Sequence, residues 1–113
     1  MNWISLTGDE QIENIKILSN SAPQVIFKHS TRCSISAMIK SRLEKSPDCG
    51  GISFYLLDLI SYRNLSSKIE VEFQVHHESP QVLLIINGAC VYDESHIGIN
   101  MKEIISEAGQ FRA

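Results

Sequence analysis

The sequence lacks paired cysteines. Its three cysteines, Cys33, Cys49 and Cys90, include no CxxC pair, and the adjacent His76 and His77 have no cysteine at zinc-finger spacing. A structural zinc site needs four ligands, usually with some of them closely spaced, so we expect no metal site. An odd number of cysteines is also untypical of a secreted disulfide scaffold, and a reducing cytoplasm would keep all of them as free thiols.

Segments typical of membrane, exported and nucleic-acid-binding proteins are missing as well. No apolar run reaches the roughly 18 residues of a membrane-spanning helix. The N-terminus, MNWISLTGDEQ, has neither the basic stretch nor the apolar core of a signal peptide, which favours a cytoplasmic location. The net charge of −3, without a basic stripe, argues against a nucleic-acid partner. A composition of 43% hydrophobic and 20% charged residues predicts one globular domain over residues 1–113.

Helix-like and strand-like hydrophobic spacings alternate along the chain. They predict helices over residues 8–20, 34–46, 61–75 and 101–109, and strands over residues 24–29, 52–59, 81–86 and 89–94. Asn87-Gly88 makes the last two strands a hairpin, whereas each strand, helix, strand order gives a right-handed parallel crossover. The sequence therefore predicts an α/β, thioredoxin-like fold with a four-stranded mixed sheet (β-α-β-α-β-β-α) and an extra N-terminal helix. We expect Asp9 and Asn100 to cap the first and last helices and residues 95–100 to form a loop.

Cys33 stands between a predicted strand and a predicted helix, in KHSTRCSIS. The first amides of a helix have no internal partners and the helix dipole adds positive potential there. A thiolate at this position should therefore be stabilised, with a pKa below the ordinary cysteine value of about 8.5. Arg32, Lys28 and His29 could add positive charge, although Lys28 and His29 should point to opposite sides of the strand. The polar neighbours favour a reactive thiol over a core residue.

Ser36 occupies the position three residues after Cys33, where a dithiol oxidoreductase carries its second cysteine. These positions are neighbours on the first turn of a helix, so the Ser36 hydroxyl could donate a hydrogen bond to the thiolate but could not form a disulfide. The pattern predicts attack by Cys33 on a mixed disulfide, with an external thiol resolving the product. We interpret Cys90 as a core residue and Cys49 as an exposed thiol in a turn.

Two further elements are expected at the same end of the fold. Pro80 directly precedes a strand, and it is either a simple strand-entry proline or part of a cis Ser79–Pro80 bond whose backbone would pair with an incoming substrate. His96 precedes the last helix and is either exposed in a turn or able to carry protons beside the thiolate. His76 and His77 are expected at a helix end, where the dipole favours their cationic forms.

The stretches KHSTRCSIS and SPQVLLIINGACVYDESHIGI resemble the YtxJ-type monothiol bacilliredoxin family, and the resemblance covers nearly the whole chain. That family has a thioredoxin-like fold and a T-x-C-x-I-S active loop. The resemblance implies removal of bacillithiol, or a similar low-molecular-weight thiol, from S-thiolated proteins. The small thiol would be a co-substrate, with no tightly bound cofactor. Cys33 would be the nucleophile, Ser36 the serine in place of a resolving cysteine and Pro80 the cis-proline. The substrate-binding residues expected are Thr31, Arg32, Ser34, Ser79, Pro80 and His96.

Two residues depart from the family pattern. The family usually has proline after the reactive cysteine, where this chain has Ser34, and the loss of a pre-organised first helical position should loosen the loop slightly. Arg32 replaces a small or polar residue, and its charge could favour the acidic malyl part of bacillithiol. Because fold does not fix function, a non-catalytic binding or adaptor module is the alternative. A cluster-binding role like that of monothiol glutaredoxins is a third option, but the C-G-F-S loop is missing.

Overall fold

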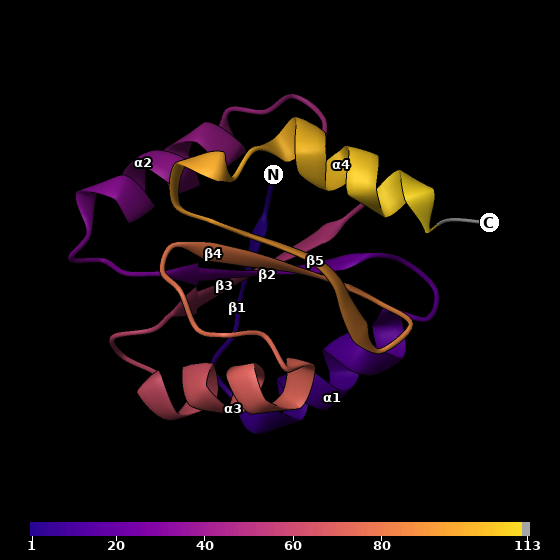
Figure 1. Cartoon of the computed structure of the whole chain (residues 1–113), viewed down its shortest axis with the longest axis horizontal. Coiled ribbons are helices and arrows are strands. Elements are labelled where there is room, and N and C mark those ends of the chain that lie inside the picture. The colour runs from indigo at the N-terminus through magenta and orange to yellow at the C-terminus, as the bar shows by residue number, and fades with distance from the viewer. Residues whose placement is uncertain (112–113) are drawn as a thin grey trace.

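The computed structural model describes residues 1–111 and contains a five-stranded mixed sheet flanked by helices (Figure 1). The strands lie in the spatial order β1-β3-β2-β4-β5. In chain order the elements are β1 (Trp3–Ser5), α1 (Asp9–Leu18), β2 (Gln24–His29), α2 (Ser34–Glu44), β3 (Ser53–Asp58), α3 (Arg63–Phe73), β4 (Gln81–Ile86), β5 (Ala89–Ser95), the 3-10 helix η1 (His96–Gly98) and α4 (Met101–Gln110). The predicted α/β class is confirmed.

Two apolar clusters, one on each face of the sheet, form the core. Helices α2 and α4 cover one face, and α1 and α3 cover the other (Figure 1). Val25 and Phe27 of β2 belong to the α2–α4 cluster, whereas Ile26 belongs to the α1–α3 cluster, as expected for alternating side chains of a strand. All six residues of β2 are buried. None of the helices formed by residues 1–111 has the length and apolar character needed to cross a lipid bilayer.

The strand register brings separate chain segments to one end of the sheet. β2 runs parallel to β3 and antiparallel to β4, with Lys28 opposite Gln81. The connection that follows β2 and the connection that precedes β4 therefore leave the sheet at the same end. Cys33 lies in the first connection and Pro80 in the second. The fold thus brings the predicted nucleophile and the predicted cis-proline to one end of the sheet.

Strand β1 is the main difference from the predicted four-stranded sheet. It pairs in parallel with β3 at one edge, with Trp3 opposite Phe54 and Ser5 opposite Leu56. Three residues are too few to show the alternation by which a strand is recognised in a sequence. They adopt the strand conformation because β3 offers a pairing partner, and such tertiary pairing is absent from local sequence patterns.

Several element ends also differ slightly from the predicted ranges. Gly8 rather than Asp9 is the N-cap of α1, and Asp9 lies in the first turn, where its charge suits the helix dipole. The Gly8 amide donates to Gln11 Oε1 at 3.0 Å, so a side chain from inside the helix satisfies it. Asn100 caps α4 as predicted, because its Oδ1 accepts a first-turn amide at 2.8 Å. Residues 95–100, expected as a loop, include the end of β5 and η1.

Trp3 attaches β1 to the α2 side of the sheet. Its ring stacks on Phe27 at a centroid distance of 5.6 Å and meets Phe54 edge-on at 5.9 Å. The indole N–H donates to Glu44 Oε2 at 2.6 Å. Lys40 pairs with Glu44 at 2.7 Å, and its Nζ lies 5.9 Å from the Trp3 ring centroid. One side chain therefore links β1 to two other strands and to α2.

We expect Trp3→Ala to lower the free energy of unfolding by about 2 kcal/mol, because it removes a partly buried aromatic side chain that contacts two other rings. Trp3→Phe should retain most of this stability. Ile4 on the same strand is 43% accessible, so Ile4→Ala is the matched control and should cost less than about 0.5 kcal/mol. Urea denaturation measures both changes. Equal costs at the two positions would show that Trp3 does not hold β1 on the sheet.

Candidate functional site

Cys33 is the N-cap residue of α2 and carries a free, partly buried thiol. Its backbone is extended, with φ −110° and ψ 119°, and its carbonyl accepts the Ala37 N–H at 3.1 Å. The Cys33 N–H donates to the Ser30 carbonyl at 3.2 Å and closes the turn that leads into the helix. The thiol thus stands at the helix mouth, as the sequence predicts, beside the first amides of α2, which have no partner within the helix.

Ser36 lies on the first turn of α2 with its side chain completely buried. Its Oγ is 2.6 Å from His29 Nδ1 and accepts the Ser30 N–H at 3.1 Å. These contacts join the end of β2 to the helix that begins after Cys33, and no sequence pattern predicts them. Donation from Ser36 to the Cys33 thiolate stays a prediction, because the structure places two other partners around this hydroxyl.

The Ser79–Pro80 peptide bond is cis, which is the second of the two alternatives considered for the sequence. Residues 74–80 join α3 to β4, and their last part, residues 76–80, is called the proline connection here and ends in the buried Pro80. The Pro80 carbonyl accepts the His96 N–H at 2.9 Å, and His96 Nε2 lies 3.7 Å from Glu78 Oε2. The Ser79 hydroxyl is buried and has no hydrogen-bond partner among the described residues. The proline connection and His96 therefore form one side of the site.

Arg42 holds η1 against α2. Its Nη2 donates to the Ile97 carbonyl at 2.9 Å and also to the Ile99 carbonyl. Arg42 is in the last turn of α2, so this contact fixes η1 to the far end of the helix. His96 itself is held at the end of the sheet where β4 begins, because its N–H donates to the Pro80 carbonyl. The structure thus gathers the three predicted site segments at one end of the sheet.

The predicted substrate-binding residues next to Cys33 in the chain are accessible. Thr31, Arg32 and Ser34 are exposed, in the turn before α2 and in its first turn. Lys28 does not join them, because its side chain is 0% accessible and its Nζ contacts His77 on the other face of the sheet. The positive charge that the sequence suggested Lys28 would supply near the thiol is therefore directed elsewhere.

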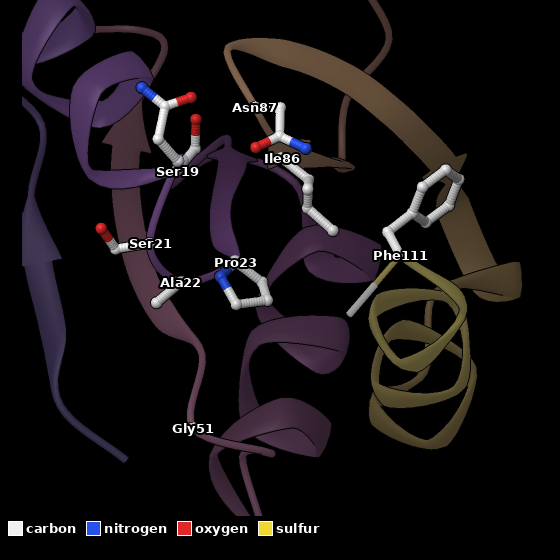
Figure 2. A pocket seen from close by; sticks show the side chains of 9 residues that line it. Ser19, Ser21, Ala22, Pro23, Gly51, Ile86, Asn87 and Phe111 are labelled. Carbon is white, nitrogen blue, oxygen red and sulfur yellow. The ribbon is translucent and has the colours of Figure 1, made fainter. Parts of the chain in front are cut away.

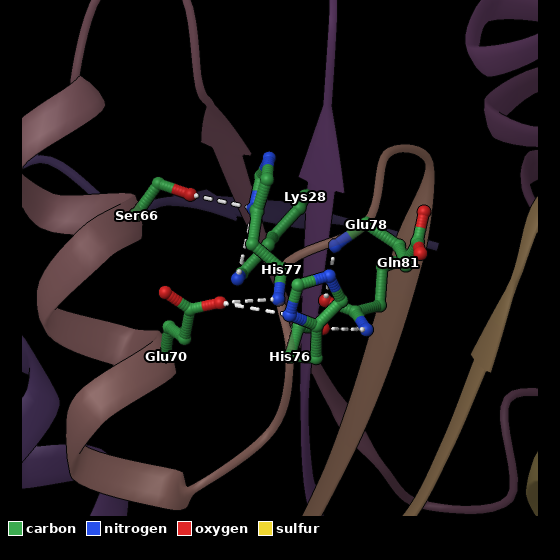
Figure 3. A network of polar contacts seen from close by, with 7 residues as sticks. All are labelled: Lys28, Ser66, Glu70, His76, His77, Glu78 and Gln81. Atoms are coloured by element: carbon green, nitrogen blue, oxygen red, sulfur yellow. Dashed lines mark hydrogen bonds and ion pairs between the residues drawn. The ribbon is translucent and has the colours of Figure 1, made fainter.

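Lys28 belongs to a polar network on the α3 side of the sheet (Figure 3). Its Nζ lies 3.2 Å from His77 Nδ1, which is also 3.2 Å from Ser66 Oγ. The His77 N–H donates to Glu70 Oε2 at 2.6 Å. Burial lowers the pKa of Lys28 to about 8, although the Glu70 carboxylate partly opposes this shift. The network fixes the proline connection to β2 and α3.

His77 is not the cationic helix-end residue that the sequence suggested. Helix α3 ends at Phe73, and His77 lies beyond it in the proline connection. Burial, and next the charge of Lys28, lower the pKa of the His77 ring. A neutral ring can accept a hydrogen bond at Nδ1 from the Lys28 ammonium, which explains how the two basic groups share one contact. His76 is exposed, with Nδ1 3.6 Å from Glu70 Oε2.

Neither of the other thiols can reach Cys33. Cys49 follows the far end of α2, an 11-residue helix that spans about 16 Å, and a disulfide needs Cα atoms within roughly 7 Å. Cys49 packs against the α2–α4 cluster, so it is partly buried rather than exposed as expected. Cys90 packs against the α1–α3 cluster, as expected of a core residue. Burial, together with the Asp93 carboxylate, raises the pKa of the Cys90 thiol to about 11.

A cavity of about 650 Å³ lies at the end of the sheet opposite to Cys33 (Figure 2). The end of α1, the residues before β2 and the β4–β5 turn line it, including Ser19, Pro23 and Asn87. Ser19 Oγ accepts the Gly88 N–H at 2.8 Å, and the Ser19 carbonyl accepts the Asn87 N–H at 3.0 Å. These hydrogen bonds tie the β4–β5 hairpin to α1, so the polar groups of the cavity have a structural role. The candidate functional site is therefore the end of the sheet that carries Cys33.

The sequence profile of monothiol bacilliredoxin BrxC matches residues 4–104 of the chain, a range that includes every segment of the site. The chain belongs to the monothiol bacilliredoxin BrxC family. The resemblance drawn from the active loop and the serine–proline strand is therefore confirmed. Family membership, together with an oxidoreductase among the structural neighbours, gives the protein a thiol redox role of the thiol–disulfide oxidoreductase kind.

Solved structures share the fold. One, described as a candidate oxidoreductase with a thioredoxin fold, is 30% identical with a TM-score of 0.76, over 95% of this chain and 90% of that one. The thioredoxin of Malassezia sympodialis is 16% identical with a TM-score of 0.74, over 99% and 92% of the two chains. The thioredoxin of Trypanosoma brucei brucei is 15% identical with a TM-score of 0.75, over 96% and 89%. The predicted thioredoxin-like fold is confirmed, and the two thioredoxins bear on the fold alone.

Replacing Lys28 by methionine should stabilise the protein at neutral pH. The ordinary lysine pKa of about 10.4 falls to about 8 in the folded protein, so below this pH the folded state holds a charge that the unfolded state solvates better. Lys28→Met removes that cost, and His77 Nδ1 keeps Ser66 Oγ as a partner at 3.2 Å. We expect the free energy of unfolding at pH 7 to rise by about 1–3 kcal/mol.

The advantage of Lys28→Met should shrink as the pH rises from about 8 to about 10. In this window the folded wild type has lost the Lys28 proton while its unfolded chain retains it, so the wild type gains stability relative to the variant. Lys68, whose side chain is 46% accessible, provides the matched control, because Lys68→Met should change little at either pH. Urea denaturation at pH 7 and pH 10 measures the difference. A Lys28→Met variant less stable than wild type at pH 7 would contradict the conclusion that the buried charge of Lys28 destabilises the folded protein.

Proposed function

We propose that this protein removes bacillithiol from S-bacillithiolated proteins by thiol–disulfide exchange at Cys33. The observation that carries the proposal is a lone thiol at the N-terminus of α2, at the same end of the sheet as the cis Ser79–Pro80 bond, with Cys49 and Cys90 out of reach. Without a resolving thiol in reach, an external thiol must regenerate Cys33. Family membership supports bacillithiol as that thiol.

The first step exchanges disulfide partners without net oxidation. The Cys33 thiolate attacks the bacillithiol sulfur of the mixed disulfide, and a new S–S bond forms as the old one breaks. The client cysteine leaves as a thiolate and takes a proton from solvent. A second small thiol, as its thiolate, then attacks the bacillithiol sulfur bound to Cys33. This step yields the symmetrical disulfide of the small thiol and regenerates the Cys33 thiolate, which the unpaired amides of α2 stabilise as the leaving group.

The exposed residues beside Cys33 are suited to hold the small thiol. Arg32 can pair with the carboxylates of the malyl group, and the hydroxyls of Thr31 and Ser34 can donate to its polar oxygens. The Ser79 backbone can pair with the client polypeptide, and the exposed His96 ring can exchange a proton with the reacting groups. The proposed partners are therefore S-thiolated proteins and a low-molecular-weight thiol, with no tightly bound cofactor in either step.

Cys33→Ser is expected to abolish release of bacillithiol from an S-bacillithiolated test protein, because a serine hydroxyl is not ionised at neutral pH and forms no disulfide. Cys90→Ala should release bacillithiol at the wild-type rate, since the Cys90 thiol is protonated at neutral pH and lies on the other face of the sheet. The intact mass of the test protein over time, with free bacillithiol present, measures release. Release by the Cys33→Ser variant would contradict the proposal.

The mass of the protein itself gives a second readout. Incubation with oxidised bacillithiol should add one bacillithiol to the wild type and to Cys90→Ala, located at Cys33 by peptide mapping, and none to Cys33→Ser. A parallel incubation with oxidised glutathione tests whether the site prefers bacillithiol. An adduct at Cys33 without turnover would instead indicate a binding module on the same fold.

A further inference from the structure

Helix α2 carries two apolar residues that the core does not use. Helical spacing predicts one apolar side made of four residues, Ile35, Met38, Ile39 and Leu43. Only Ile39 and Leu43 are buried, whereas Ile35 is 45% accessible and Met38 is 48% accessible. The two exposed residues are three positions apart, so they are neighbours on the helix surface. Ile35 is the second residue of α2 and therefore lies close to the helix mouth, where Cys33 is the N-cap.

A third exposed apolar side chain lies beside these two. Ile97 is the middle residue of η1 and is 67% accessible. Its carbonyl accepts a hydrogen bond from Arg42 at 2.9 Å, and Arg42 is the neighbour of Met38 one turn further along α2. Figure 1 shows η1 next to α2. Ile35, Met38 and Ile97, the apolar strip, therefore extend from the helix mouth to η1.

The apolar strip is held in place although it is exposed. Arg42 also donates to the Ile99 carbonyl, and the His96 N–H donates to the Pro80 carbonyl at 2.9 Å. The residues around Ile97 are thus anchored, and the other two residues of the strip stand on a regular helix. Single exposed apolar residues are ordinary, whereas a group of them rimmed by polar residues marks an interaction site. A group that is already held in position loses less entropy when it binds.

The exposed surface next to Cys33 has two parts of different chemistry. Thr31, Arg32 and Ser34 present hydroxyl and guanidinium groups, whereas the apolar strip presents hydrocarbon and one thioether. A mixed disulfide also has two halves, a polar, acidic small thiol and a polypeptide. Carboxylates gain nothing from contact with apolar side chains, so the small thiol fits the polar part. Because an S–S bond of about 2 Å joins the halves, the polypeptide lies nearby, and the apolar strip is the surface left for it.

We propose that the apolar strip binds apolar side chains that flank the modified cysteine of the client protein. This inference rests on Cys33 being the reactive thiol of the proposed function. Three partly exposed side chains offer far less than the roughly 800 Å² that each partner buries in a standard interface. A second copy of this chain would therefore not bind stably here. A client that must leave after each exchange needs only such a weak contact.

Nuclear magnetic resonance of the methionine methyl groups tests binding without any chemistry at Cys33. Met38 reports on the apolar strip, and Met101, which is buried in α4, is an internal control. The probe is a peptide with leucines on both sides of a serine that replaces the client cysteine. We expect it to shift the Met38 signal and to leave Met101 unchanged, whereas a peptide with serines in place of the leucines should shift neither. No shift of Met38, or equal shifts with both peptides, would overturn the proposal.

Met38→Gln and Ile97→Gln test whether the apolar strip selects clients. The substrates are two S-bacillithiolated peptides of equal length and charge, one with leucines and one with serines beside the modified cysteine. In the wild type, kcat/KM for bacillithiol release should be higher for the leucine peptide. Each substitution should lower this value about five- to tenfold through KM, the effect of losing roughly 50 Å² of buried apolar area. The serine peptide should be released at the wild-type rate by both variants.

Two controls separate docking from damage to the site. Ile17 is 65% accessible near the end of α1, on the other face of the sheet, so Ile17→Gln should change kcat/KM for neither peptide. The rate of alkylation of Cys33 should be the same in all variants, because none of them alters the helix mouth. Equal losses of kcat/KM with both peptides, or no loss with the leucine peptide, would overturn the proposal.

Sedimentation velocity distinguishes a client from a second copy of this chain as the occupant. We expect the wild-type protein and Met38→Gln to sediment alike, as monomers. A wild-type dimer that Met38→Gln dissociates would overturn the proposal and assign the apolar strip to self-association.

Failure of this proposal can be distinguished from failure of the proposed function, because the methyl signals report binding without bacillithiol. If bacillithiol release fails while the leucine peptide alone shifts the Met38 signal, the docking surface stands and the assigned reaction is wrong. If the wild type releases bacillithiol from both peptides with equal kcat/KM, the exchange activity stands and the docking surface is overturned.

Discussion

The structure depends on the burial of a whole strand that ends in two basic residues. Every residue of β2 is buried, and Lys28 and His29 at its carboxyl end must therefore find partners inside the protein. Lys28 meets His77 in the proline connection on one face, and His29 meets Ser36 on the first turn of α2 on the other. Each partner belongs to a segment that forms the site. Satisfying the polar end of one strand thus positions both the proline connection and the helix that carries Cys33.

This placement explains how a thioredoxin fold can operate with one thiol. Cys49 is separated from Cys33 by the length of α2, and Cys90 lies beneath the opposite face of the sheet. Ser36, at the position of a resolving cysteine, is held by its bonds to β2 and to the turn before the helix. The serine therefore ties the active helix to the core, a role that a sulfur in a disulfide could not perform at the same time. One residue thus leaves the helix without a second thiol and anchors it to the core.

Short motifs and hydrophobic spacing were enough to predict the order of the long elements, the position of Cys33 at a helix mouth and the serine–proline pair before β4. They could not predict β1, because three residues become a strand only by pairing with β3. They also could not predict the partners of Lys28 and Ser36. Local sequence encodes periodicity and turn chemistry. The contact between Lys28 and His77 on one face of the sheet forms only when strands and helices pack. The prediction that Lys28 adds positive charge beside the thiol is wrong for this reason.

The two edge strands of the sheet affect how readily other chains can add to it. One edge is β1, which has only three residues, and the other is β5, which carries Asp93 and Glu94 and shifts register against β4 between Leu84 and Ile85. Short edge strands, charges and bulges all discourage foreign strands from adding to a sheet. Both edges of the sheet therefore resist the addition of strands from other chains, and with it aggregation through the sheet.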